Sequence, residues 1–146
     1  MNSAILRNPV RIRLYWSIWI ALVAVAFALR FTLFWGASEQ RRFALATGYG
    51  LGTWLPIMAL NLIEGRNLTL TLRSRHYREW EQLNYVPFLG CVGHNGFRML
   101  RWLYSKEDFG DPIVVSLKAE HRSFIRFVLT VFLSYIVIMP GLLIGL

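Results

Sequence analysis

Cysteine and charge are both scarce in this sequence. Cys91 is the only cysteine among 146 residues, which excludes an internal disulfide and a metal site built from several thiolates. Charged residues make up 16% of the chain, below the roughly 25% of a typical soluble domain, so a fully water-facing surface is not expected. Acidic residues are the scarcest, because 8 Asp and Glu oppose 16 Lys and Arg, for a net charge of +8.

Hydrophobic residues take the place of the missing charge. They account for 55% of the chain, 15% of the residues are aromatic, and the mean hydropathy is +0.43. Intrinsic disorder is excluded because it requires low hydrophobicity. A nucleic-acid partner is not expected despite the pI near 10.4, because a nucleic-acid-binding patch normally lies on a polar surface. We therefore expect a small integral membrane protein of the all-α class.

Three apolar runs are each long enough to cross a bilayer, which takes about 20 residues per helix. The predicted transmembrane helices are 14–35, 43–63 and 127–146. Arg30 is the only charged residue in these runs, and we expect its long side chain to reach the lipid headgroups from the helix end. The first run exceeds the apolar core of a signal peptide, so it is predicted to be an uncleaved anchor.

The basic residues are distributed unevenly between the two sides of these spans. Residues 1–13 and 64–126 together hold 13 Lys and Arg, whereas residues 36–42 hold two. Cytoplasmic segments of membrane proteins carry the excess of Lys and Arg. We predict that residues 1–13 and 64–126 are cytoplasmic, and that residues 36–42 and the C-terminus are periplasmic.

The second predicted span carries a face of small residues. Ala44, Gly48 and Gly52 recur every four residues, a spacing that allows another helix to approach closely. We expect this face to pack within the chain, against the first or third span. Packing against another protein, either a different subunit or a second copy of the chain, is the alternative.

The long segment 64–126 is predicted to be mostly helical and amphipathic. Residues 68–72 alternate leucine with threonine, which fits either a short strand or a continuation of the second span. Short helices are expected at 74–83 and 97–105, separated by a break that contains several glycines. The second of these helices places Phe97, Leu100 and Tyr104 on one face.

A third helix of this segment has a clear start. Asp111 is a typical N-cap residue and Pro112 suits the first helical position. Because Pro140 is the first breaker that follows, one continuous helix should run from Pro112 through the third span.

Basic residues of the same segment are candidates for contact with anionic lipid headgroups. Each basic side chain near such a surface gains about 1 kcal/mol, and adjacent aromatic residues favour an interfacial position. The candidates are Arg73, Arg75, Arg78, Arg98 and Arg101.

Residues with catalytic or metal-binding chemistry lie outside the predicted spans. His76, His94 and His121 are not in a span, which disfavours a haem or pigment ligated within the bilayer. The eight acidic residues are also outside the spans, which disfavours proton-coupled transport by this chain alone. We therefore predict no cofactor and no metal.

Two polar groupings remain as weak hypotheses. Cys91 and His94 are spaced as a possible nucleophile and base, but the spacing alone is not specific, and inert residues are the simpler interpretation. Asp108, Asp111 and His121 could approach one another, although a helix cap explains Asp111 and a solvated turn explains Asp108.

Residues 72 to 130 contain a series of single residues whose order and spacing, rather than one motif, are informative: Leu72, Arg73, Tyr77, a glycine-rich break ending near Asn95, Arg98, Trp102, Tyr104, Asp108, Asp111, Arg122, Phe124, Ile125 and Thr130. In this order and spacing the segment resembles universal stress protein B. It implies a small bacterial inner-membrane protein linked to stress or stationary phase, with no catalytic residues to carry over. This chain has an additional N-terminal span.

Three functions follow as hypotheses. The first is a non-enzymatic membrane protein, an accessory or structural subunit of an inner-membrane complex or a stress-related protein, which acts by helix packing. The second is a sensor of anionic lipid at the membrane surface. The third, an enzyme that uses Cys91 and His94, has the least support.

Overall fold

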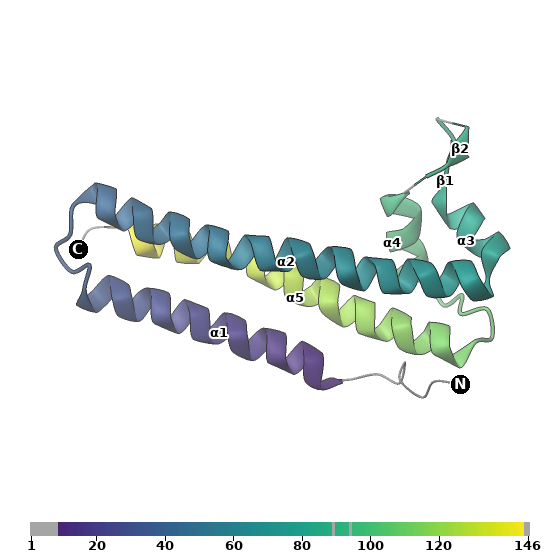
Figure 1. The fold of residues 1–146 in the computed structure, drawn as a ribbon, viewed down its shortest axis with the longest axis horizontal. Coiled ribbons are helices and arrows are strands. Elements are labelled where there is room, and N and C mark those ends of the chain that lie inside the picture. Colours follow the sequence, from purple (N-terminus) through teal and green to yellow (C-terminus); the bar gives the residue numbers. More distant parts are fainter. Residues whose placement is uncertain (1–8, 89, 94, 145–146) are drawn as a thin grey trace. The chain divides into compact units, whose positions relative to one another are not determined.

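The computed structural model describes residues 9–144 except 89 and 94. Its elements are shown in Figure 1 and are, in order, α1 (Pro9–Thr32), α2 (Glu39–Arg75), α3 (Tyr77–Asn84), β1 (Tyr85–Val86), β2 (Cys91–Val92), α4 (Gly96–Tyr104) and α5 (Pro112–Leu143). The all-α class predicted from the sequence is confirmed, with a two-stranded hairpin as the only sheet in the described part of the chain.

The chain divides into two compact units. Asn8–Leu60 and Phe124–Leu146 form the first, which we call the bundle unit. The second, the connecting unit, contains Asn61–Ser123. Helices α2 and α5 each contribute residues to both units, because the division falls within each of them.

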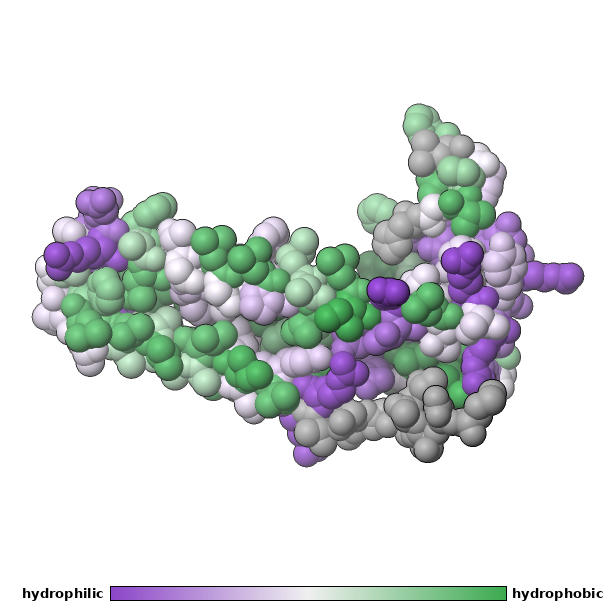
Figure 2. Space-filling view, viewed as in Figure 1, coloured by the Kyte–Doolittle hydropathy of each residue, from purple (hydrophilic) through white to green (hydrophobic). Residues whose placement is uncertain are grey.

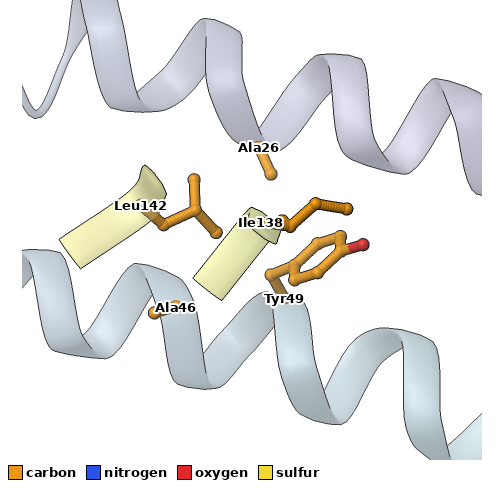
Figure 3. Packing of buried hydrophobic residues seen from close by; sticks show 5 residues of the cluster. All are labelled: Ala26, Ala46, Tyr49, Ile138 and Leu142. Atoms are coloured by element: carbon orange, nitrogen blue, oxygen red, sulfur yellow. The ribbon is translucent and has the colours of Figure 1, made fainter. Parts of the chain in front are cut away.

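The bundle unit consists of three helical segments that lie side by side: α1, residues 39–60 of α2 and residues 124–143 of α5 (Figure 1). Small and large side chains from all three helices interlock in its core, as Figure 3 shows for Ala26, Ala46, Tyr49, Ile138 and Leu142. Helix α5 approaches α1 closely at one point, where a Cβ on Gly141 would lie 3.3 Å from the Phe27 ring.

A second cluster in the bundle unit is largely aromatic. Phe124, Phe127 and Val131 of α5 are buried there, and α1 supplies Tyr15 and Trp16. The Trp16 and Phe127 rings meet edge to face with centroids 5.2 Å apart, a favourable arrangement for two aromatic rings. This contact joins α1 to α5.

Helices α1, α2 and α5 are each long and apolar enough to cross a membrane. Only 6%, 17% and 22%, respectively, of the residues in their most apolar stretches are buried. Figure 2 shows hydrophobic side chains over much of the visible face of the bundle unit. Water would solvate such a surface poorly, and lipid or another protein would cover it.

The turn between the first two helices comprises residues 33–38 rather than the predicted 36–42, so it lies closer to the N-terminus. Helix α1 ends at Thr32 rather than at residue 35, and α2 begins at Glu39 rather than at residue 43. The turn closes with Gly36 at φ +70°, a conformation that favours glycine because it has no Cβ. The hydrogen bond from Phe34 N to Leu29 O, at 3.0 Å, ends α1.

Helix α2 continues into the connecting unit without a break. It runs through residues 68–72, so the predicted continuation of the second span is confirmed and the alternative of a strand is wrong. Leu68 and Leu72 lie one helical turn apart and are buried, whereas Leu70 between them is exposed. The alternation of leucine and threonine was therefore compatible with one buried helical stripe.

The glycine-containing break forms a β-hairpin. Tyr85 pairs with Val92, and Val86 pairs with Cys91, in antiparallel register. The Gly93 Cα lies under the Val86 side chain, where an added Cβ would be 3.3 Å from Val86 Cγ2. Asn95 joins this hairpin to α4, because its Nδ2 donates to Tyr85 O at 3.1 Å and its Oδ1 accepts from Arg98 N at 3.1 Å.

The remaining helices follow the prediction. Helix α4 is present, its buried residues are Met99, Trp102 and Leu103, and the face with Phe97, Leu100 and Tyr104 is exposed. Helix α5 is continuous from Pro112 to Leu143, as predicted. It contains Pro140 within its last turn and starts at Asp111, whose Oδ1 accepts from Ile113 N at 2.8 Å.

Candidate functional site

An apolar groove lies between α1 and α2 in the bundle unit. It consists of two adjoining hollows of about 380 and 390 Å³ that share Leu22, Gly52 and Thr53 as lining residues. One hollow continues past Trp19 and Pro56, and the other continues past Ala44 and Gly48. Their walls are almost entirely hydrocarbon, which suits a lipid chain or the side of an apolar helix rather than a polar substrate.

The small-residue face of α2 forms the floor of this groove. A Cβ placed on Gly48 or on Gly52 would meet no heavy atom within 4 Å among the described residues. Ala44, Gly48 and Gly52 are all exposed. The expected packing of this face within the chain is therefore wrong, since Ala46, Tyr49 and Thr53 make the contacts of α2 in the core.

A polar link between helices lies beneath the groove. Thr53 Oγ1 donates to Tyr49 O at 2.8 Å in its own helix, and its lone pairs accept from the Tyr135 hydroxyl of α5. Thr53 is 4% exposed, so its hydroxyl is satisfied away from solvent. The link fixes α2 against α5 and leaves the other side of α2 open to the groove.

Arg30 is buried rather than extended toward headgroups. It is 3% exposed, and its guanidinium donates to three backbone carbonyls: Leu142 O at 3.2 Å, Phe34 O at 3.0 Å and Ile144 O at 2.7 Å. The carbonyls at the end of α5 have no partner within the helix and carry partial negative charge, so a cation suits this position. Arg30 thus joins the end of α1 to the end of α5, which corrects the prediction of a headgroup anchor.

The connecting unit brings a histidine and an aspartate together. His76 Nε2 lies 3.1 Å from Asp111 Oδ2, and Arg75 Nη1 lies 3.4 Å from the same oxygen. Burial raises the pKa of Asp111, but hydrogen bonds from the Ile113 amide, His76 and Arg75 outweigh it and leave the pKa below its usual value. The pair ties the end of α2 to the start of α5.

This pairing differs from the grouping that the sequence suggests. Asp111 contacts His76 rather than His121, which lies ten residues further along α5, about 15 Å away at 1.5 Å per residue. Asp108 is in the solvated turn that was expected, where its Oδ1 accepts from Gly110 N at 3.1 Å. Burial lowers the pKa of His121, and the charge of Glu64 partly offsets that shift.

Lys118 is a buried cation that no sequence pattern singles out. It is 2% exposed, and its Nζ donates to Glu107 O at 2.7 Å and to Ser105 O at 3.1 Å. The same Nζ lies 4.4 Å from the centroid of the Trp102 ring. Burial and the nearby charge of Arg122 lower the pKa of Lys118. The sequence signal that could have indicated the burial of Lys118 is its position on α5, one helical turn after Val114.

Phe109 packs against the same tryptophan. Its ring stacks on Trp102 with centroids 5.6 Å apart and lies 5.2 Å from the His76 ring. Phe109 has φ +57°, a strained conformation for a residue with a side chain, and the two ring contacts hold it there. These contacts hold the connection between α4 and α5 in place. The polar residues of this unit therefore contribute to its packing.

The five candidate arginines lie on three helices. Arg73 stacks over the Trp80 ring at 5.2 Å, Arg75 pairs with Asp111, and Arg98 Nη1 donates to Gln82 O at 3.1 Å. Arg78 and Arg101 are exposed. Three of the five therefore have contacts within the protein that compete with lipid headgroups.

The proposed nucleophile pair is only partly described. Cys91 is exposed on β2, and His94 lies outside the described residues. Among the residues described, no three His, Cys, Asp or Glu side chains are grouped so that they could hold a metal ion.

Comparison with protein-family models, with curated proteins and with solved structures finds no match to this chain.

Proposed function

We propose that this protein is an integral membrane protein that works without catalysis, as an accessory or structural subunit that packs against a transmembrane helix of another chain. Three helices long and apolar enough to span a bilayer support the membrane location. The resemblance to universal stress protein B supports a bacterial inner membrane and a link to stress.

The exposed floor of the α1–α2 groove carries this proposal. Gly48 and Gly52 present backbone with open space above it, so a second helix could approach α2 more closely than it could approach a surface of large side chains. Between apolar helices in lipid, close packing rather than the hydrophobic effect drives association. An empty small-residue face therefore fits a binding surface better than a face that only contacts lipid.

The orientation is part of the proposal. The excess of basic residues, 13 in segments 1–13 and 64–126, supports a cytoplasmic position for these segments and a periplasmic position for residues 36–42 and the C-terminus. Exposed Cys91 on β2 tests this directly because it is the only thiol. A membrane-impermeant maleimide should label Cys91 only after the cells are permeabilised. Labelling in intact cells would reverse the orientation.

Filling the groove tests the subunit function. The double variant Gly48→Leu, Gly52→Leu should keep the fold, because each new side chain meets open space, but should exclude a docked helix. Blue-native electrophoresis of membranes in mild detergent should show the wild-type chain in a complex and the double variant as a monomer.

Gly65 provides the matched control. It also lies within α2, and an added Cβ there would meet no described heavy atom within 4 Å, but it is not a groove residue. Gly65→Leu should migrate with the wild-type complex. A monomeric wild-type chain, or a complex that survives the double substitution, would contradict the proposal and leave lipid as the occupant of the groove.

A further inference from the structure

Helix α4 has two apolar faces, and in the described part of the chain only one of them is buried. Met99, Trp102 and Leu103 form the buried face. On the opposite face Phe97 is 90% exposed, and Tyr104 is 52% exposed. In the hairpin turn just before this helix, Phe88 is 96% exposed. Large apolar side chains in such positions indicate a surface that another phase or molecule covers.

Basic residues are interspersed with these aromatic side chains. Arg101 is four residues after Phe97 and three before Tyr104, so it lies on the same exposed helix face. Lys106 follows the helix and is also exposed. Between Gln82 and Glu107 the chain contains Arg98, Arg101 and Lys106 and no acidic residue. The surface therefore combines aromatic groups with uncompensated positive charge.

The exposed aromatic residues are held on an ordered support. Asn95 connects the hairpin to α4 through Tyr85 O, and Arg98 connects α4 to α3 through Gln82 O at 3.1 Å. Gly93 N donates to Asn84 O at 2.8 Å, which closes the hairpin against the end of α3. The exposure of Phe88 and Phe97 is thus a property of a packed hairpin and helix rather than of a frayed segment.

We infer that the hairpin turn and the exposed face of α4 form a docking surface for an anionic lipid bilayer, with Phe88 and Phe97 inserted among the headgroups and Arg101 and Lys106 paired with lipid phosphates. Aromatic residues favour the interfacial layer of a membrane, and basic residues are attracted to its negative surface. Helices α2 and α5 contribute residues to both the connecting unit and the apolar bundle unit. Insertion of the bundle unit would therefore keep the connecting unit at a high effective concentration near a bilayer surface. The inference rests on the membrane insertion proposed above.

Cys91 provides a probe at the proposed surface. It is exposed on β2, three residues after Phe88, and it is the only thiol in the chain. The full chain, labelled there with the environment-sensitive dye nitrobenzoxadiazole, would be reconstituted into vesicles of phosphatidylcholine alone or with one third phosphatidylglycerol. Flotation of the vesicles first measures insertion itself, so failure of insertion is distinguished from failure of the surface to dock.

Docking should shift the dye emission to the blue and allow quenching by nitroxide-labelled lipid in the phosphatidylglycerol vesicles. The shift should be several-fold smaller in phosphatidylcholine and should fall at high salt, because the attraction is electrostatic. Phe88→Ser with Phe97→Ser, and separately Arg101→Gln with Lys106→Gln, should each reduce it. Arg41→Gln removes an exposed charge from the first turn of α2, away from this surface, and should leave the emission shift unchanged.

Two results would overturn the inference. One is a dye that remains equally exposed to water in both kinds of vesicle. The other is a dye that is shielded in both and becomes exposed when the protein is diluted in lipid, because a second copy of the chain rather than the bilayer would then cover the surface.

Discussion

Arg30 and Lys118 are the two fully buried cations among the described side chains, and both are stabilised by backbone carbonyls. Arg30 donates to carbonyls at the ends of α1 and α5, and Lys118 donates to two carbonyls between α4 and α5. In each case a charge satisfies acceptors that a helix end or a turn leaves without a partner. Arg30 therefore connects segments more than 110 residues apart, whereas Lys118 connects α5 to a turn 11 to 13 residues before it.

Arg30→Met should lower the free energy of unfolding of the bundle unit. The methionine retains much of the apolar stem, but the carbonyls of Leu142 and Ile144 lose their donor. Hydrogen bonds to charged groups each contribute about 1.5–3 kcal/mol, so a loss of at least that size is expected. Unfolding in mixed detergent, followed by tryptophan fluorescence, measures it. Exposed Arg41→Met is the matched control, and an equal loss in both variants would show that Arg30 is not an anchor.

His121 should make stability depend on pH. Burial lowers its pKa, so as the pH falls below about 6.5 the unfolded chain binds a proton before the folded chain does. Stability should therefore decrease between about pH 7.5 and pH 5.5. His121→Gln should remove that part of the decrease, measured as the difference between the two unfolding curves. Equal decreases in the two proteins would contradict this assignment.

The chemistry of single residues was the hardest part to predict from the sequence. Asp111 was expected to cap a helix and does, because capping depends on the residues that follow it. Its contact with His76 joins residues 35 positions apart, and no local pattern encodes such a pair. Arg30 was assigned to headgroups because its carbonyl partners on α5 are 112 and 114 positions away.

At the scale of whole elements, the buried link between Thr53 and Tyr135 joins α2 to α5. Thr53→Val keeps the shape of the side chain and removes the hydroxyl from this link. Hydrogen bonds between transmembrane helices contribute about 0.6 kcal/mol on average and up to about 1.7 kcal/mol. The free energy of unfolding should therefore fall by a value within about 0.6–1.7 kcal/mol. The same detergent titration measures it.

Thr32→Val is the matched control for this element contact. The Thr32 hydroxyl donates to Ala28 O at 2.7 Å in its own helix and is exposed, so its loss should have little effect. If Thr32→Val were as destabilising as Thr53→Val, the loss would reflect helix propensity rather than contact between α2 and α5.

Helices were predicted well from the sequence, and the faces that they present to neighbours were not. Long apolar runs and the Asp-Pro start located α1, α2 and α5, because these signals are local. Which side of α2 faces the core depends on α1 and α5, so the glycine face was wrongly expected to be inside. The hairpin was missed because its turn carries Pro87 and Phe88 rather than a common two-residue glycine turn.

At the scale of the whole molecule, two features of the bundle unit bear on function: its exposed apolar surface and its groove. Most residues of the three long helices are not buried within the chain, and the hollow between α1 and α2 is lined by hydrocarbon. A bilayer satisfies the first feature. For the second we propose a docked helix, and this proposal is the central claim.

Photo-crosslinking from the rim of the groove tests this claim most directly. Val25 lines the groove and is 54% exposed, whereas Ile20 is 57% exposed and is not a groove residue. The two positions are about 140° apart around α1 at 100° per residue. Replacing each in turn with p-benzoylphenylalanine places the same photo-reactive group at the groove and on another face of one helix.

Illumination of native membranes should give a protein adduct of defined mass from position 25, either with a second copy or with a different subunit. Position 20 should give adducts with lipid or none. Protein adducts of the same mass and yield from both positions, or lipid adducts alone from position 25, would contradict the docking of a helix in the groove.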